Sequence, residues 1–338
     1  MQRERIEIIQ IIRFLGAVCI VLYHSGLVGE HGYFGVEIFS IISGYIIVYS
    51  TRQTEDRKNF LLKRFIRIVP LYWLMTLFMY AIICLYPALS IMSEAKPEYL
   101  IKSMLFLPFQ NSRGYNVPIL GVGWTLNYEV LFYLIFFAAI CLNHSHRSII
   151  AGAMITFLTI IGCAFRISAG GVPFCLNYYT DSFLLEFAFG ILAFYIIEYL
   201  QKRVTGKGSR MICFVLAFIS FVWMFLDLTV SSSLPRSIRI GIPALIFFCS
   251  VLLWGRTIHF KRIFLELGNM SFSIYLVEYF TTAIYKIIAG NQPIVFKIII
   301  FMIMILITLF ISYISYRVIE VRFTGWIKGK MKRVKVQP

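Results

Sequence analysis

The chain has 338 residues, of which 59% are hydrophobic and only 14% are charged, and its net charge is +16. So high an apolar fraction excludes a soluble globular domain and indicates an integral membrane protein. In a soluble protein the positive charge would suggest nucleic acid. Here basic cytoplasmic loops that face anionic lipid account for it, so we expect the bilayer and no nucleic acid as a partner.

The first apolar stretch, residues 7–27, is long enough to cross a bilayer as a helix. Arg13 and His24 interrupt it. They are eleven residues apart, so they lie on one helix face with roughly 16 Å between them along the axis. Because lipid solvates neither a guanidinium nor an imidazole, this face must look into protein or water.

Nine further apolar stretches follow, and we predict an all-α bundle of about ten transmembrane helices. Lysine and arginine concentrate on one side of these spans, which places both termini in the cytoplasm. We treat residues 1–338 as one transmembrane domain, embedded over about 6–320, with a basic cytoplasmic tail at 321–338 and no soluble domain. The predicted spans are 7–27, 34–50, 69–86, 122–142, 149–165, 182–200, 211–230, 238–254, 271–289 and 295–316.

Two connections between the spans have distinctive sequences. Residues 51–68 form a basic cytoplasmic loop before the third span, and Pro70 suits the first turn of that span because its missing N–H costs little there. The longest connection, 87–121, is expected outside. It contains an amphipathic piece at 99–107, which we expect at the outer surface of the membrane, near an acceptor.

Four glutamates also fall inside predicted spans: Glu37, Glu129, Glu186 and Glu278. A carboxylate is costly in hydrocarbon, so each is a candidate for a functional site, with an interhelical salt bridge or hydrogen bond as the structural alternative. His24, near the outer end of the first span, can act at neutral pH as a general base or as a transient acyl carrier. Its structural alternative is a core histidine that is hydrogen-bonded to a neighbour.

Five sequence blocks, in order, resemble the membrane-bound acyltransferase family 3. The first is the pair Arg13 and His24 within an apolar helix. The others are GVEIFSIISGY at 35–45, KRFIRIVP at 63–70, GWTLNYEVLFY at 123–133 and LGNMSFSIYL at 267–276. Each block alone is a weak signal, but five in order over nearly the whole chain form a specific one.

The resemblance implies an enzyme of the bacterial cytoplasmic (inner) membrane that moves an acyl group, most often acetyl, from cytoplasmic acyl-coenzyme A to a sugar hydroxyl. The acceptor would be a surface glycan such as an O-antigen, an exopolysaccharide or a lipid-linked unit. Acetyl-coenzyme A would be the donor substrate, and no bound cofactor or metal is expected. Larger members of the family add a soluble hydrolase-like domain; the sequence shows none, so we expect direct transfer to the acceptor.

The resemblance also implies roles for individual residues. His24, Glu129 and Arg13 would be catalytic, with Glu129 orienting the imidazole or stabilising its protonated form. Arg13, Arg64 and Arg67 would bind the donor, because guanidinium groups hold phosphates through forked hydrogen bonds. The residues expected to line the substrate are Trp124, Glu37, Tyr133 and Tyr275.

Two positions depart from the family pattern. Glu37 stands where an aspartate is common, and Glu278 stands where the late block commonly has a histidine. A transporter that relays protons through His24 and the carboxylates is the alternative function, and a non-catalytic scaffold ranks last. Acyl transfer from acetyl-coenzyme A without an ion gradient would separate the enzyme from the transporter.

Overall fold

The computed structural model describes residues 2–29, 31–52, 57–87, 92–168, 173–226 and 234–334. Over these ranges the chain is helical and has no strand. The long helices are α1 (Gln2–Ser25), α2 (Gly35–Thr51), α3 (Arg57–Leu85), α5 (Trp124–Leu142), α6 (Arg147–Ser168), α8 (Leu185–Leu200), α9 (Lys207–Leu226), α10 (Ile242–Trp254), α12 (Ser271–Ala289) and α13 (Ile294–Ser315).

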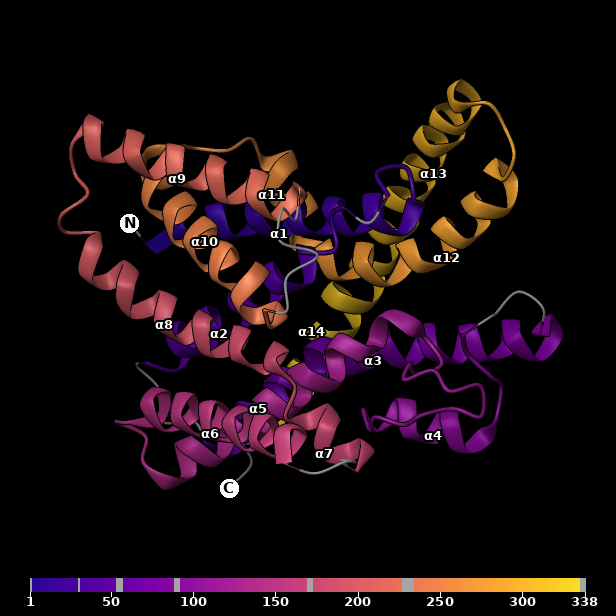
Figure 1. Ribbon diagram of the computed structural model, residues 1–338, viewed down its shortest axis with the longest axis horizontal. Coiled ribbons are helices and arrows are strands. Elements are labelled where there is room, and N and C mark those ends of the chain that lie inside the picture. The colour runs from indigo at the N-terminus through magenta and orange to yellow at the C-terminus, as the bar shows by residue number, and fades with distance from the viewer. Residues whose placement is uncertain are drawn as a thin grey trace. The chain divides into compact units, whose positions relative to one another are not determined.

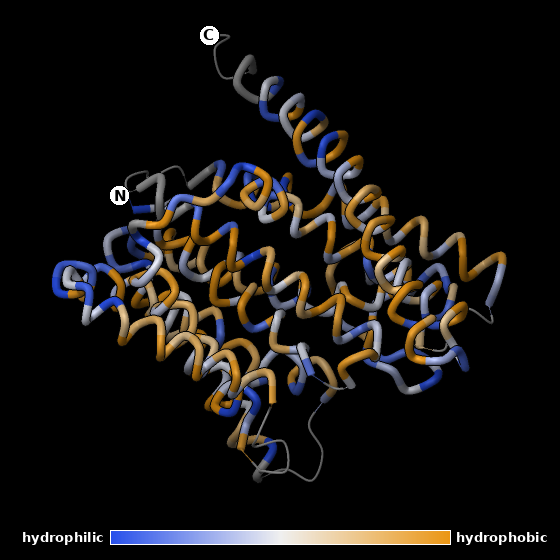
Figure 2. The backbone as a smooth tube through the Cα atoms, turned by 90° about the horizontal axis from the view of Figure 1, so that it is seen from above, coloured by the Kyte–Doolittle hydropathy of each residue, from blue (hydrophilic) through white to orange (hydrophobic). Residues whose placement is uncertain are grey.

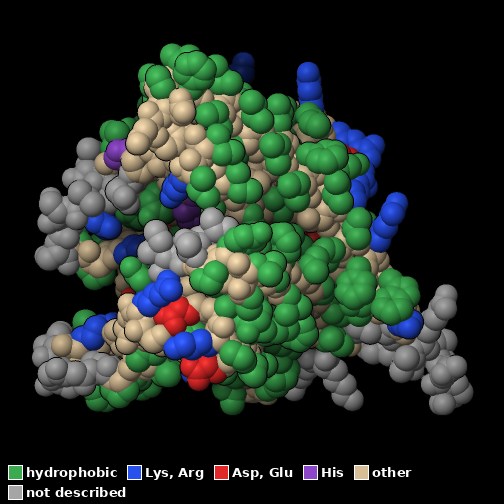
Figure 3. Space-filling model, turned by 90° about the vertical axis from the view of Figure 1, so that its right-hand side faces the viewer, with side chains coloured by type: hydrophobic (Ala, Val, Ile, Leu, Met, Phe, Trp, Pro, Cys, Tyr) green, Lys and Arg blue, Asp and Glu red, His purple; other side chains and the backbone are tan. Residues whose placement is uncertain are grey.

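Each of the ten predicted spans coincides with a helix over its described residues, and residues 227–230 of the span predicted at 211–230 lie outside them. Among the described residues, nine helices are long and apolar enough to cross a membrane, and α2 is a shorter apolar helix. Hydrophobic residues run along the long helices (Figure 2), and on the face shown in Figure 3 hydrophobic side chains cover most of the surface. The chain is therefore a multi-pass membrane protein that turns apolar side chains toward lipid.

The prediction for the start of the third span is wrong. The helix α3 begins at Arg57 and has Pro70 in its interior, so most of the predicted basic loop 51–68 is helical. Hydropathy detects only the apolar part of a helix, whereas here charged turns precede that part on the same element. A proline is tolerated inside a membrane helix because neighbouring groups satisfy the carbonyl that it frees. Arg64 and Arg67 are therefore fixed on the spanning helix.

Shorter helices lie between the spans. The helix α4 (Pro97–Met104) confirms the amphipathic piece predicted at 99–107. Hydropathy did not indicate α7 (Phe174–Tyr179), α11 (Arg262–Asn269) or α14 (Thr324–Val334), because they are too short or too polar. A π-helical turn, η4 (Ser237–Gly241), leads into α10, and a second one, η6 (Tyr316–Phe323), joins α13 to α14.

The chain divides into two compact units. Unit 1 comprises Met1–Glu55 and Leu134–Ser271, and unit 2 comprises Asp56–Tyr133 and Phe272–Pro338. The division passes through α5, whose first half belongs to unit 2, and through the first turn of α12. The single domain expected over 1–338 stays a prediction.

In unit 1, α2 and α8 cross at a pair of glycines. A Cβ on Gly44 would collide with the carbonyl oxygen of Phe187, and a Cβ on Gly190 would collide with that of Ile41. Small residues at such a crossing let membrane helices approach closely. In the same unit α9 and α10 lie side by side, and α11 packs on α1 (Figure 1).

The connection between α1 and α2 turns back along α1. Gly32 has a φ of +101°, which favours glycine, and a Cβ there would lie 2.5 Å from the carbonyl oxygen of Cys19. Cys19 stands six residues before the end of α1 at Ser25, a distance of about 9 Å along the helix. The loop therefore runs down beside the helix instead of leaving its end.

The helix α2 starts beside the middle of α1. A Cβ on Gly35 would collide with the carbonyl oxygen of Gly16, which is nine residues before the end of α1, or about 13 Å. The helix α2 has 17 residues, fewer than any of the nine candidate spans among the described residues. Its position beside Gly16 places the first turn of α2 deep within unit 1.

In unit 2, α12 and α13 form a hairpin (Figure 1). The hydroxyls of Thr281 and Thr308 lie 2.7 Å apart across it, and the Thr308 hydroxyl donates to the carbonyl of Met304 at 2.8 Å. The helix α4 is attached to α3. Trp73 Nε1 donates to the carbonyl of Met104 at 2.8 Å, and Tyr72 Oη donates to that of Ser103 at 3.3 Å. The connection that carries α4 is therefore a packed part of this unit.

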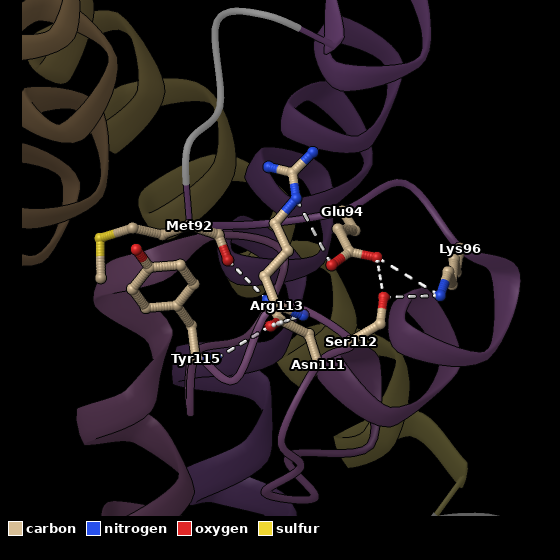
Figure 4. A network of polar contacts seen from close by, with 7 residues as sticks. All are labelled: Met92, Glu94, Lys96, Asn111, Ser112, Arg113 and Tyr115. Carbon is tan, nitrogen blue, oxygen red and sulfur yellow. Dashed lines mark hydrogen bonds and ion pairs between the residues drawn. The ribbon is translucent and has the colours of Figure 1, made fainter.

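A polar network organises the same connection (Figure 4). Ser112 Oγ donates to Glu94 at 2.6 Å, Lys96 Nζ lies 3.4 Å from that carboxylate, and Arg113 Nε lies 3.6 Å from it. The hydrogen bond from Ser112, together with the two cations, holds the pKa of Glu94 below its ordinary value. Asn111 completes the network by donating to the carbonyl of Met92 at 2.6 Å.

Candidate functional site

Arg13 and His24 lie on the same helix, α1, in unit 1. Arg13 is 8% exposed, and its Nη1 donates to Oε1 of Gln10 at 3.1 Å. His24 is half-buried in the last turn of α1, with its ring 5.3 Å from that of Tyr23. The continuous helix keeps the two residues about 16 Å apart along its axis.

Glu129 and Tyr133 form a pair one turn apart on α5. Tyr133 Oη donates to Oε1 of Glu129 at 2.5 Å, and the tyrosine is 1% exposed. The Arg64 guanidinium lies over the Tyr133 ring at 6.0 Å and interacts electrostatically with Glu129. Within unit 2 the tyrosine therefore orients the carboxylate, and the arginine balances its charge.

Sequence reasoning separated Arg64 from Glu129, and the structure brings them together. Arg64 lies seven residues after the start of α3, or about 10 Å along that helix. Arg67, nearly one turn further, interacts electrostatically with Tyr133 as well. The signal that was missed is spacing. Glu129 and Tyr133 are four positions apart and the two arginines are three positions apart, which puts each pair on one helix face.

The first turn of α5 is held by α12 within unit 2. Tyr275 Oη donates to the carbonyl of Val122 at 2.6 Å and lies 2.8 Å from the hydroxyl of Thr125. Trp124 is the first residue of α5, and its ring meets the Tyr128 ring edge-on at 6.1 Å. Tyr275 thus supports the turn that presents Trp124. The substrate-lining roles of Trp124, Tyr133 and Tyr275 stay predictions.

Glu37 has a partner that sequence reasoning missed. Its buried carboxylate forms an ion pair with Nε of Arg236, which directly precedes the turn η4. Glu186, also fully buried, interacts electrostatically with both residues. From sequence, Arg236 reads as a loop cation that flanks an apolar span. The available signal was the presence of two intramembrane carboxylates in unit 1 that need a counter-charge.

The candidate residues are divided between the two units. Unit 1 holds Arg13, His24, Glu37 and Glu186, and unit 2 holds Arg64, Arg67, Trp124, Glu129, Tyr133, Tyr275 and Glu278. Glu278 is fully buried in α12, where Thr282 donates to its Oε2 at 3.4 Å. Each unit therefore carries buried charged groups, which are candidates for a functional site.

Comparison with known proteins bears on the role of these groups. The model of an acyltransferase domain family matches residues 6–317. Over 180 residues the chain is 34% identical to the exopolysaccharide production protein ExoZ of Rhizobium meliloti (strain 1021). This match covers 51% of the chain and 54% of that protein, so the chain spans about half the length of this curated relative. No solved structure matches the chain.

Proposed function

The chain belongs to the acyltransferase domain family, and from this premise we propose that it O-acylates a bacterial surface glycan. The proposed enzyme lies in the cytoplasmic (inner) membrane and moves an acetyl group from cytoplasmic acetyl-coenzyme A to a sugar hydroxyl. The similarity to ExoZ supports an exopolysaccharide as the glycan.

The observation that carries the proposal is the pair of polar residues on α1. A buried guanidinium and a half-buried imidazole on one membrane helix are costly unless a function retains them. Their separation of about 16 Å suits a donor that is anionic at one end and carries its acyl group at the other. Arg13 would hold the anionic end, and His24 would act where the acyl group is transferred.

The reaction follows from the chemistry of an imidazole. As a general base, His24 takes the proton of the sugar hydroxyl while the sugar oxygen attacks the thioester carbonyl carbon. A C–O bond forms, the C–S bond breaks, and the thiolate of coenzyme A leaves and takes up a proton. As an acyl carrier, His24 would instead attack the thioester first, and the sugar hydroxyl would then open the acyl-imidazole. Both routes yield the O-acyl sugar and coenzyme A.

The arginines of α3 support donor binding in this scheme. Arg64 and Arg67 supply forked donors for the phosphates of coenzyme A. Because Arg64 also neighbours Glu129 and Tyr133, a bound phosphate would alter the charge balance around that carboxylate. Donor binding and the orientation of Glu129 are thereby linked within unit 2.

Acyl transfer by the purified protein tests the proposal. Wild-type protein in vesicles receives acetyl-coenzyme A and oligosaccharides from the alkali-deacylated exopolysaccharide of its host, with no ion gradient. We expect O-acetylated product from the wild type and a loss of roughly 10³-fold for His24→Ala, in line with removal of a general base. His31→Ala is the matched control. His31 lies in the loop between α1 and α2, and its ring stacks on that of Phe225 in α9 with 5.5 Å between the ring centroids.

Two results would contradict the proposal. One is substantial acetylation by folded His24→Ala protein. The other is ion-coupled flux of the sugar without acyl transfer, which would favour the proton-coupled transporter. Acid quenching during turnover with labelled acetyl-coenzyme A then separates the two routes, because only the carrier route leaves a labelled acyl-protein that is absent from His24→Ala.

A further inference from the structure

A carboxylate centre lies in unit 1 where α2, α8 and α10 begin, beside the middle of α1. It consists of Glu37, Glu186, Arg236 and Ser237. The two glutamates stand in the first turns of α2 and α8, and the other two residues stand at the turn η4. Gly241 closes this turn against Glu186, because a Cβ on Gly241 would lie 3.4 Å from Cγ of the glutamate.

The centre has more hydrogen-bond acceptors than donors. Among the described residues, both carboxylate oxygens of Glu186, Oε2 of Glu37 and Oγ of Ser237 are buried without a hydrogen-bond partner. Arg236 donates to the other oxygen of Glu37. Buried polar atoms are seldom left unpaired, since losing water without a replacement is costly. The centre is therefore suited to a ligand that brings hydrogen-bond donors.

Arg236 is the part of the centre that a ligand meets first. Its side chain is 31% exposed, whereas that of Glu37 is 0% exposed. The guanidinium lies over the rings of Tyr33 at 5.1 Å and Phe183 at 5.6 Å. The loop that holds Tyr33 runs back beside α1, and irregular backbone at membrane depth lines protein or water, not lipid. Among the charged side chains of the centre, that of Arg236 is therefore the one that a ligand can reach from outside.

Aromatic rings connect the centre to His24. The Tyr33 ring lies 6.0 Å from that of Tyr23, which lies 5.3 Å from the imidazole of His24. The Tyr33 hydroxyl accepts a hydrogen bond from Nη2 of Arg239 at 3.3 Å, so the ring is fixed from both sides. A ligand held by the two glutamates would extend along these rings toward the imidazole.

We propose that the carboxylate centre binds the acceptor sugar, with Glu186 and Glu37 accepting hydrogen bonds from its hydroxyl groups; this inference rests on the proposed acyltransferase function. Each sugar hydroxyl offers a donor for a carboxylate oxygen and lone pairs for Arg236 and Ser237. Two carboxylates beside one guanidinium disfavour an anion. In the part of the chain that the structure describes, no group of three His, Cys, Asp or Glu side chains could hold a metal ion.

The test compares Glu186→Gln with Glu198→Gln in the vesicle assay with acetyl-coenzyme A and the deacylated oligosaccharide. Glu198 lies on the same helix, α8, but its partners are Arg52 and Gln201. We expect Glu186→Gln to raise the KM for the oligosaccharide at least tenfold, as for a lost hydrogen bond to a charged group, without changing the KM for acetyl-coenzyme A. Glu198→Gln should leave both constants within twofold of the wild type.

The outcomes separate this inference from the proposed function. If the wild type transfers acetyl groups but Glu186→Gln keeps the wild-type KM for the oligosaccharide, the acceptor site is wrong and the acyltransferase stands. If the wild type transfers none, the proposed function itself fails. A rise in the KM for acetyl-coenzyme A alone would also overturn the acceptor site, because it would assign Glu186 to the donor.

A folding defect would not leave the question open. Gel filtration in detergent shows whether Glu186→Gln is monodisperse. If it is not, Ser237→Ala serves as the second variant, since it removes one small hydroxyl of the same centre. We then expect a rise of about threefold to tenfold in the KM for the oligosaccharide, the range for one neutral hydrogen bond. An unchanged KM in folded Ser237→Ala would overturn the proposal.

Discussion

Tyr133 gives Glu129 a defined orientation. Its buried hydroxyl donates to one carboxylate oxygen at 2.5 Å, and the ring in turn lies beneath the Arg64 guanidinium. Arg64, Glu129 and Tyr133 therefore form one cluster, in which a single phenolic O–H orients the carboxylate.

We expect Tyr133→Phe to lower kcat for acetyl transfer about tenfold, because a hydrogen bond to a charged group is lost while the ring still fills its site. Turnover at saturating acetyl-coenzyme A measures this. Tyr285→Phe is the control, since that tyrosine is equally buried in α12 and packs on Phe301. Equal rates for both variants would show that Glu129 does not need its tyrosine.

Single residues differ in how far the sequence could predict them. Arg13, His24 and Glu129 could be located because a charged or polar group within an apolar run is visible along one dimension. The partner of Glu37 could not, because Arg236 lies 199 residues away in the chain. No local pattern reports which arginine will reach a given carboxylate once the helices pack.

For whole helices, too, the sequence predicts what depends on a local pattern and misses what depends on packing. All ten spans could be predicted, since bilayer thickness sets the length of apolar sequence that a helix needs. The start of α3 and the descent of the loop around Gly32 along α1 could not be predicted. Both depend on backbone packing inside a unit, such as the contact of Gly32 with Cys19, and hydropathy does not record it.

The crossing of α2 and α8 is a point where one methyl group matters. A Cβ on Gly190 would collide with backbone atoms of α2, whereas a Cβ on Gly152 in α6 would meet nothing within 4 Å. We expect Gly190→Ala to lower the Tm of the detergent-solubilised protein by about 5 °C, as overpacking does. Gly152→Ala should leave the Tm unchanged or raise it slightly. A Tm for Gly190→Ala equal to that of Gly152→Ala would contradict the tight crossing.

Considered as a whole, the molecule distributes its five sequence blocks over both units. The blocks at α1 and α2 lie in unit 1, those at α3 and the start of α5 lie in unit 2, and the late block runs from α11 into α12 across the division. Neither unit alone therefore carries the complete set. The continuous helix α5 joins the two units covalently, so both belong to one catalytic chain.

The predicted topology applies to the whole chain and can be tested by labelling. Ser112, in the network of Figure 4, and Ser145, between α5 and α6, are both exposed. We expect a membrane-impermeant maleimide to label Ser112→Cys from the outside of spheroplasts and Ser145→Cys only after permeabilisation, because the termini are predicted in the cytoplasm. The unsubstituted chain gives the background from its own cysteines. The reverse pattern would invert the topology.

The return of the described loop residues 26–29 and 31–34 along α1 has an electrical consequence. A membrane potential falls across the insulating layer, and moving one charge through it costs about 2.3 kcal/mol per 100 mV. An opening that admits a sugar also admits water, which would then reach about 9 Å down α1. His24, at the end of that helix, would then stand on the water side of the insulating layer. Charge that moves at this end of α1 during acyl transfer would cross little of the potential, so the reaction would be insensitive to the energy state of the membrane.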